Sequence, residues 1–375
     1  MKRQWLSAAM TAALVSVAIG SANAATELKA TLATSPKHPF VLAGYQPFVK
    51  AVEDASKGDI KIQLFLGGQL LSYKATLGGL RDQIADLGFA VPAYHPAELK
   101  DAQLVADFAM IGSSAPVMAA ATTEYNLLYC TDCFQQLLAQ GVVDLGAAAT
   151  QPYRIVTKRP VNTAEDLKGM KIRSGAGLWN RMLVHFGATP LSVPADEIFQ
   201  ALSSGVADGT LSFGSAVRTY ALWDPAKYIT MTHLGTFHEL SLYAFSKKSW
   251  ASLTTAQRRL FLDTVAPYLS GPSVADIIAE EDMLAEAKGK GVTIIQQSPA
   301  LKAAFDAWMV EDFKVLAEAS EKAGVKNAAA KIAKFRDIYA KWDKLVKPIE
   351  RDSVKIGAIM KAEIFDRIDA ATFGR

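Results

Sequence analysis

Residues 162–214 decide the fold. They contain Asn162-Thr-Ala-Glu-Asp-Leu-Lys-Gly-Met-Lys-Ile-Arg173, then Phe186-Gly-Ala-Thr-Pro190, and then Gly205-Val-Ala-Asp-Gly209. The run Lys171-Ile172-Arg173 predicts a short strand that ends in an arginine beside a glycine-rich turn. Open α/β sheets bind ligands at such strand ends. A guanidinium there holds a carboxylate through two parallel hydrogen bonds, so Arg173 is the predicted anchor of an anionic ligand. The alternative is an internal salt bridge from Arg173 to Asp208 or Glu197.

The N-terminus predicts export. Lys2 and Arg3 precede an apolar run over residues 5–19, and Ala22-Asn23-Ala24 has the small-x-small pattern of a cleavage site. This pattern is typical of a secretory signal peptide, here residues 1–24, removed after Ala24. The alternative is a membrane anchor, but the apolar run is short for a membrane span. We therefore expect the mature protein in the periplasm.

Charge and length exclude one class of partner and favour a two-lobed chain. The sequence has 40 basic and 37 acidic residues, and removal of Lys2 and Arg3 leaves 38 basic residues against 37 acidic ones. A nearly neutral chain lacks the basic footprint of nucleic-acid binding. A chain of 375 residues of which half are hydrophobic is long enough for two lobes.

The two cysteines lie close together, in Cys130-Thr-Asp-Cys133. A local disulfide between Cys130 and Cys133 fits an exported protein best. A redox-active pair and two buried free thiols are the alternatives. Two sulfurs are too few for a structural zinc site without further ligands, and the scattered histidines have no metal-ligand spacing. We predict no metal site.

The order of predicted elements indicates an α/β fold. Residues 28–91 alternate strand-like and helix-like runs, which argues for a mostly parallel sheet covered by helices, and residues 153–222 repeat that alternation. Residues 239–245 are extended and apolar, and are expected to return the chain to the first lobe. The predicted division is residues 25–150 plus about 239–272 for the first lobe, 151–238 for the second, and 273–375 for a mainly helical region. That region either braces both lobes or pairs with a second copy in a homodimer.

Several short motifs occur in a specific order along the mature chain. They are Phe48-Val-Lys-Ala-Val-Glu53, Gly67-Gly-Gln-Leu70, Asp86-Leu-Gly88, Asp166-Leu-Lys-Gly-Met-Lys-Ile-Arg173, Gly187-Ala-Thr-Pro190, Gly205-Val-Ala-Asp-Gly209, Lys227-Tyr-Ile-Thr230 and Ser246-Lys-Lys-Ser-Trp250. In this order and spacing the chain resembles the solute-binding proteins of tripartite ATP-independent periplasmic (TRAP) transporters, of the dicarboxylate-type binding-protein family.

The resemblance implies a periplasmic binding-protein fold with two lobes, a hinge and a ligand buried between the lobes. It also implies that Arg173 pairs with the carboxylate of a small organic acid, and that the partners are the TRAP membrane permease subunits, driven by an ion gradient rather than by ATP. A receptor of this kind is not an enzyme and needs no cofactor.

One segment departs from the family pattern. Many relatives continue Asp-Gly with a polar residue, then Glu, Asn and Pro, whereas this chain reads Thr210, Leu211, Ser212 and Phe213. Ser212 is a shorter polar contact than the family asparagine, and Phe213 adds an aromatic wall, to which Trp179 could add a second ring. These changes favour an aromatic or largely apolar monocarboxylate. The alternative for Phe213 and Trp179 is ordinary core packing.

Loops at predicted strand ends supply the other candidate ligand contacts. In the first lobe these are His38, Phe40, Gln69 and Tyr94, and the Tyr94 phenol can donate to a carboxylate oxygen. In the second lobe Arg154 offers another positive charge, with a structural or solvated role as its alternative.

The sequence offers three other function classes. Gly175-Ala-Gly177-Leu-Trp-Asn180 follows a strand as a dinucleotide fingerprint does, but it lacks the third glycine, and Trp179 is too bulky beside a pyrophosphate. A periplasmic hydrolase or oxidoreductase acting on an organic acid would need a nucleophile, a metal or a cofactor near Arg173, and the sequence shows none. A binding module that feeds a sensory system remains the other alternative.

Overall fold

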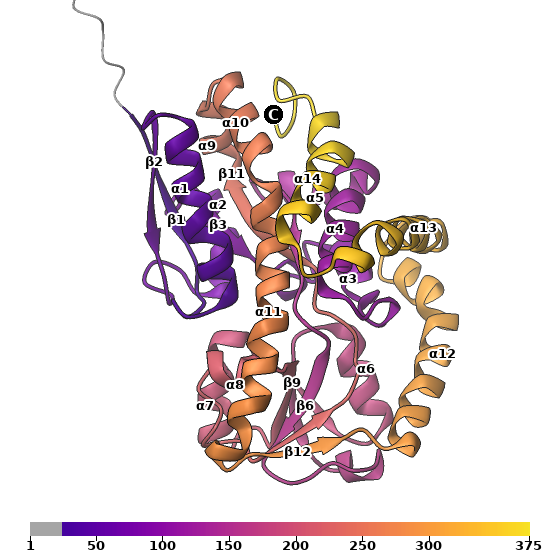
Figure 1. Cartoon of the computed structure of the whole chain (residues 1–375). Coiled ribbons are helices and arrows are strands. Elements are labelled where there is room, and N and C mark those ends of the chain that lie inside the picture. Colours follow the sequence, from indigo (N-terminus) through magenta and orange to yellow (C-terminus); the bar gives the residue numbers. More distant parts are fainter. Residues whose placement is uncertain (1–24) are drawn as a thin grey trace, which may run out of the picture.

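Each of the two lobes is built around a six-stranded mixed sheet, as the computed structural model shows (Figure 1). The structure describes residues 25–375, so the predicted signal peptide lies outside the described residues. Within this part of the chain, no helix is long and apolar enough to cross a membrane. The chain therefore has the predicted α/β fold with two lobes and a long helical C-terminal region.

The first sheet combines parallel strands near the N-terminus with an antiparallel strand from much later in the chain. Its order is β2-β1-β3-β11-β4, with β5 also paired to β11. The pairs β1–β2 and β1–β3 are parallel, whereas β11 runs antiparallel to β3, β4 and β5. The strands are β1 (Thr26–Thr31), β2 (Ile60–Phe65), β3 (Leu87–Ala90), β4 (Val142–Asp144), β5 (Ala147–Ala148) and β11 (Leu240–Ser246). The expected return of the chain near residue 239 is thus a strand inside the first sheet.

The second sheet has the order β12-β10-β6-β9-β7-β8. Strand β12 comes from the region expected to be mainly helical and pairs in parallel with β10. The central strand β6 is antiparallel to both β9 and β10, so this sheet is less parallel than its strand–helix alternation suggested. The strands are β6 (Tyr153–Thr157), β7 (Lys171–Ser174), β8 (Thr189–Ser192), β9 (Gly209–Phe213), β10 (Tyr228–Met231) and β12 (Thr293–Gln296).

Helices cover both sheets and form most of the C-terminal third. Their bounds are α1 (Gln46–Ala55), α2 (Tyr73–Arg81), α3 (Lys100–Ala106), α4 (Ala115–Glu124), α5 (Thr131–Ala139), α6 (Gly177–His185), α7 (Ile198–Ser203), α8 (Ala216–Thr219), α9 (Lys247–Ser252), α10 (Thr255–Thr264), α11 (Ala266–Ala287), α12 (Pro299–Lys322), α13 (Ala328–Val346) and α14 (Ser353–Glu363). Helices α4 and α5 are separated by the π-helical turn Tyr125–Tyr129. Helix α10 is capped by Thr254, which forms a capping box with Gln257.

Helix α11 runs along both lobes (Figure 1) and carries two buried acids that bind the second lobe. Asp276 accepts hydrogen bonds from the Ser215 hydroxyl and from the backbone N–H of Gln151 at 2.9 Å. One turn further on, Glu280 pairs with Arg154 at 2.8 Å, and both side chains are about nine-tenths buried. Because α11 also packs on the first lobe, these contacts connect the two lobes.

The C-terminal helices contact both lobes in turn. Helix α12 packs on α6 of the second lobe, where Arg181 pairs with Asp312 at 2.8 Å. Arg181 also pairs at 2.9 Å with Asp107, which follows α3 of the first lobe. Helix α13 then packs on α4 of the first lobe. The guanidinium of Arg181, on the second lobe, therefore joins one acid of the first lobe and one of the C-terminal helices.

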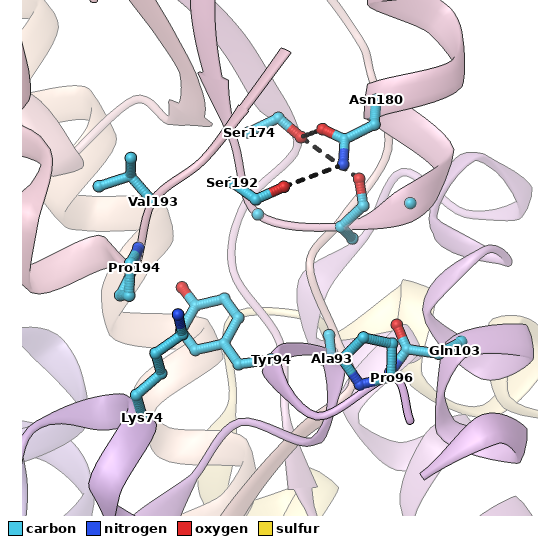
Figure 2. Close-up of a pocket in the computed structure, with 13 residues that line it drawn as sticks. Lys74, Ala93, Tyr94, Pro96, Gln103, Ser174, Asn180, Ser192, Val193 and Pro194 are labelled. Carbon is cyan, nitrogen blue, oxygen red and sulfur yellow. Dashed lines mark hydrogen bonds between the residues drawn. The ribbon is translucent and has the colours of Figure 1, made fainter. Parts of the chain in front are cut away.

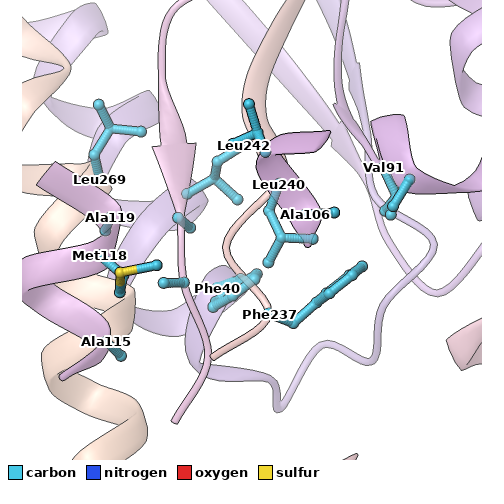
Figure 3. Close-up of a cluster of buried hydrophobic side chains, with 14 of the residues drawn as sticks. Phe40, Val91, Ala106, Ala115, Met118, Ala119, Phe237, Leu240, Leu242 and Leu269 are labelled. Atoms are coloured by element: carbon cyan, nitrogen blue, oxygen red, sulfur yellow. The ribbon is translucent and has the colours of Figure 1, made fainter. Parts of the chain in front are cut away.

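One apolar core extends from α4 to the space between the lobes. Figure 3 shows Met118 and Ala119 of α4 near Leu269 of α11, with Leu242 of β11 in the same cluster. Phe40 and Phe237 belong to this core and are 2% and 5% exposed. The aromatic wall described below is thus the edge of the main core.

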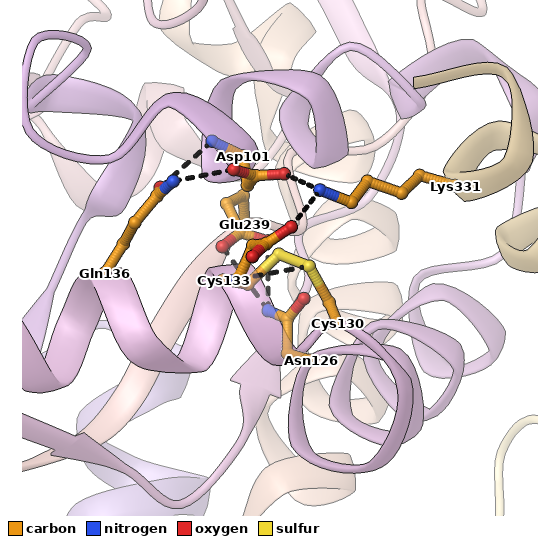
Figure 4. The surroundings of a disulfide bond; sticks show 8 residues. Asp101, Asn126, Cys130, Cys133, Gln136, Glu239 and Lys331 are labelled. Carbon is orange, nitrogen blue, oxygen red and sulfur yellow. Dashed lines mark hydrogen bonds and ion pairs between the residues drawn. A yellow bond between two sulfur atoms is a disulfide. The ribbon is translucent and has the colours of Figure 1, made fainter. Parts of the chain in front are cut away.

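The disulfide lies beside a polar cluster at the start of α5 (Figure 4). Cys130 and Cys133 are bonded, with their Cα atoms 5.2 Å apart. Nearby, Lys331 of α13 pairs with Asp101 at 2.5 Å and with Asp132 at 2.6 Å. Because Asp132 lies between the two cysteines, the disulfide holds the helix end that α13 contacts.

The Arg154–Glu280 pair yields a stability prediction. Arg154→Ala is expected to lower the free energy of unfolding by roughly 3 kcal/mol, because it leaves the Glu280 charge buried without its partner. Urea denaturation at neutral pH measures this loss. The double variant Arg154→Ala/Glu280→Gln removes the stranded charge and should recover part of it. Equal destabilisation in the single and double variants would contradict this account.

Glu239 yields a pH prediction. Burial raises the pKa of Glu239 to about 8, although a hydrogen bond from Asn126 opposes the shift. Its stabilising contribution is therefore complete below pH 4.5, the ordinary value, and is lost as the pH rises through 8. Glu239→Gln, which does not titrate, should gain stability relative to the unsubstituted protein between pH 5 and 8 in denaturation curves. The exposed control Glu318→Gln should keep a constant difference over that range, and a constant difference for Glu239→Gln would refute the prediction.

Candidate functional site

A small cavity with a volume of about 30 Å³ lies between the two sheets. Its walls come from both lobes and are mostly aromatic. The lining residues are His38, Phe40, Tyr73, Phe89, Val91, Tyr94, Thr150, Tyr153, Ala195, Phe213, Tyr220, Phe237 and Leu240. Four of the predicted contacts, His38, Phe40, Tyr94 and Phe213, are among them.

Strand pairing builds the second-lobe wall. Tyr153 of β6 is paired with Phe213 of β9, so both rings lie on the same face of the sheet. Trp179 of α6 stacks on Tyr153, with ring centroids 4.1 Å apart and planes 10° apart, and its indole N–H donates to the Leu234 carbonyl. Trp179 is fully buried and does not line the cavity, so it supports Tyr153 from behind instead of offering the ring expected from the sequence.

Arg154 and Ser212 lie on the opposite face of the same strands. They are paired with each other, one residue along from Tyr153 and Phe213, and neither lines the cavity. Arg154 is occupied by Glu280, which gives it the structural role that the sequence left as its alternative. The Ser212 hydroxyl is buried without a hydrogen-bond partner.

His38 and Phe40 build part of the first-lobe wall. Their rings are 4.6 Å apart, and the His38 ring is 5.7 Å from that of Phe213 across the cavity. Burial lowers the pKa of His38 to about 3, so the ring is neutral. Its Nδ1 accepts a hydrogen bond from the Phe40 backbone at 3.0 Å, which assigns the proton to Nε2. His38 therefore supplies one N–H donor to a wall that is otherwise largely apolar.

Gln69 lies away from this cavity. It is exposed on the loop after β2, and its backbone N–H bonds to the Leu66 carbonyl. The glycines before it, Gly67 and Gly68, both have positive φ and turn the loop at the surface. The expected contact from Gln69 is not part of the site as it stands in this structure.

Arg173 is 1% exposed and lies beside the cavity at the boundary of the two lobes. Its Nε donates to the Val193 carbonyl at 2.7 Å, its Nη1 contacts the Leu211 carbonyl at 3.5 Å, and its Nη2 donates to the Tyr94 hydroxyl at 3.1 Å. Across residues 25–375 no acidic side chain forms an ion pair with it. Of the two acids considered from the sequence, Asp208 accepts from the Lys171 backbone and Glu197 is exposed.

A larger pocket with a volume of about 430 Å³ lies on the other side of Tyr94. Figure 2 shows polar side chains around it, including Lys74 of the first lobe and Asn180 of α6, which bonds to Ser174 at 2.8 Å. Tyr94 lines both this polar pocket and the aromatic cavity. The Arg173 guanidinium also reaches this boundary. Gly175 lines the pocket, and a Cβ atom placed on Gly175 would lie 3.6 Å from Nη2 of Arg173.

Several lining residues were not identified from the sequence. Tyr153 was recoverable, because it begins a predicted strand beside the strand that carries Phe213. Tyr73, Tyr220 and Phe237 come from a helix, a short turn and an irregular segment that meet only in the folded chain. Burial raises the pKa of both Tyr153 and Tyr220, so these phenols remain protonated and can donate hydrogen bonds.

The sequence is similar to those of known bacterial binding proteins. The family model described as bacterial extracellular solute-binding protein, family 7, matches residues 31–320. A curated relative, the sialic acid-binding periplasmic protein SiaP of Vibrio cholerae, is 22% identical over 74% of this chain and 85% of its own. Several further curated relatives are matched over only about half of their length.

Solved structures of similar fold include two TRAP solute-binding proteins. That of Rhodoferax ferrireducens, in complex with copurified benzoate, has a TM-score of 0.76 at 21% identity, covering 86% of this chain and 99% of its own. That of Bordetella bronchiseptica, with bound (R)- and (S)-mandelate, has a TM-score of 0.74 at 22% identity, covering 85% and 100%. The family match spans well over half of the sequence, and the chain belongs to bacterial extracellular solute-binding protein family 7 with the fold of TRAP solute-binding proteins.

Proposed function

We propose that this protein is the periplasmic receptor of a TRAP transporter and that it binds a small aromatic or largely apolar monocarboxylate between its lobes. The observation that carries the proposal is the buried guanidinium of Arg173, which within residues 25–375 hydrogen-bonds only to neutral oxygens. A buried cation is costly unless a charged group pairs with it. A carboxylate arriving from solution would supply that partner, and the fork of the guanidinium favours a carboxylate over a neutral group.

The cavity wall supports an aromatic ligand. Rings of Phe40, Phe89, Phe213 and Phe237 surround the space, and aromatic side chains prefer edge-to-face or offset contacts with another ring. A sugar acid would bury several hydroxyls against these rings, and each buried hydroxyl needs a hydrogen-bond partner. The benzoate and mandelate of the two related structures agree with this class of ligand, whereas the name of SiaP marks sugar acids as the rival class.

Delivery to the transporter follows from closure of the lobes. The ligand docks on the second lobe at Arg173, and contacts from the first lobe, His38 and Phe40 among them, are completed when the lobes close. Ligand binding favours the closed form because these contacts are made better there than in the open form. The TRAP permease subunits are the proposed partners that recognise this form.

A thermal melting panel tests the ligand class. Benzoate, 3-hydroxybenzoate or mandelate at a hundredfold excess over its dissociation constant should stabilise the folded protein by about 2.7 kcal/mol and raise Tm by a few degrees. Galacturonate and sialic acid should produce little shift. Mass spectrometry should recover the bound acid chemically unchanged. A shift with the sugar acids alone would refute the aromatic assignment, and turnover of the acid would refute the receptor.

Arg173→Lys tests the anchor. It should weaken binding of the acid identified by the panel by roughly 10- to 100-fold, because an ammonium cannot reproduce the charge-assisted fork. Isothermal titration calorimetry measures the affinity, and a melting curve without ligand checks that the lost contacts to Val193 and Leu211 have not unfolded the lobe. The exposed control Arg336→Lys should bind normally. Normal binding by Arg173→Lys would remove the carboxylate role.

A further inference from the structure

The Tyr94 hydroxyl occupies a position suited to an anion. Its oxygen accepts one hydrogen bond from Arg173 Nη2 at 3.1 Å and a second from the backbone N–H of Ala195 at 3.2 Å. Both donors belong to the second lobe, whereas Tyr94 belongs to the 3₁₀ turn Pro92–Tyr94 of the first lobe. A neutral phenol thus accepts the convergent pair of donors, one of them cationic, that a carboxylate oxygen would accept.

Of the three groups within residues 25–375 that accept hydrogen bonds from Arg173, Tyr94 is the one that can move away from it. The other two acceptors, the carbonyls of Val193 and Leu211, are main-chain groups of the same lobe as the arginine. Tyr94 is half-buried, and it borders the polar pocket, which gives its ring space to move. When the lobes separate, Tyr94 moves with the first lobe and both of its hydrogen bonds break.

We propose that Arg173 Nη2 and the Ala195 N–H form the carboxylate subsite, and that Tyr94 is an internal substitute that fills this subsite and holds the lobes together until a ligand displaces it. The proposal rests on the proposed function, and it reverses the role expected from the sequence, in which the Tyr94 phenol donates to the bound carboxylate. Exchange favours the ligand, since hydrogen bonds to a carboxylate are stronger than those to a neutral phenol. Burial raises the pKa of Tyr94, so the phenol does not become a competing anion.

This assignment gives the aromatic cavity and the polar pocket different roles. With Tyr94 in place, its ring separates the aromatic cavity from the polar pocket. Once the ring withdraws, the two spaces meet at Arg173. A ligand then has its carboxylate at the junction, its ring among the phenylalanines, and any polar substituent free to reach Asn180 or Lys74 on the outer side.

The variant Tyr94→Phe distinguishes a tyrosine that competes with the ligand from one that donates a hydrogen bond to it, because the two roles predict opposite changes in affinity. If Tyr94 competes with the ligand, the variant should bind benzoate more tightly, on the order of tenfold, because no hydrogen bond has to be displaced. Its ligand-free form should also be more open, with a larger radius of gyration in small-angle X-ray scattering. The control Tyr268→Phe, another half-buried tyrosine that lies outside both spaces, should change neither quantity.

Weaker or unchanged benzoate affinity, or an unchanged radius of gyration, would overturn the proposal, and weaker affinity would restore Tyr94 as a donor to the ligand. Failure of the proposed function gives a different result. If the unsubstituted protein binds none of benzoate, 3-hydroxybenzoate and mandelate, the ligand class is wrong, and scattering of the ligand-free proteins still decides whether Tyr94 holds the lobes together.

Discussion

A cation buried between two lobes without a charged partner is the constraint on which the site depends. Arg173 has three neutral acceptors, and two of them are backbone carbonyls that fix the plane of its guanidinium. Burying this charge costs desolvation free energy, and in return the second lobe holds a rigid hydrogen-bond donor in position for an anion. The surrounding rings lower the local dielectric, which strengthens the attraction between the guanidinium and an anion. The same rings restrict which anions fit beside it.

Each lobe is built from segments that are distant in sequence, which fixes the two lobes on either side of Arg173. Strand β11 returns to the first sheet, β12 returns to the second, and α11 lies along both. The buried pairs on α11, Asp276 with Ser215 and Glu280 with Arg154, keep the helix attached to the second lobe. Arg181 adds a link on the side of α6, with an acid from the first lobe and another from α12. The lobes are therefore connected by a few polar contacts beside a continuous core.

Local signals in the sequence predicted the two α/β lobes and an arginine near the end of β7, because strand alternation and strand-end position are local properties. The strands β6, β9 and β11 were expected as extended segments, but the antiparallel pairing of β6 with β9 and of β11 with β3 was not apparent, since strand direction depends on the path of the chain. The site was predictable only in part. Phe213 was placed in the wall by one departure from the family pattern, whereas Trp179 has a supporting position because Tyr153, one layer nearer, covers it.

The stack of Trp179 on Tyr153 has a spectroscopic consequence. An indole held parallel to a phenol at van der Waals distance is sensitive to small displacements of that phenol, and the phenol forms part of the wall that a ligand would touch. If a ligand binds there as proposed, it would alter the surroundings, and so the emission, of a tryptophan that has no contact with solvent. The protein contains its own fluorophore for following capture of a solute in real time, without an attached dye.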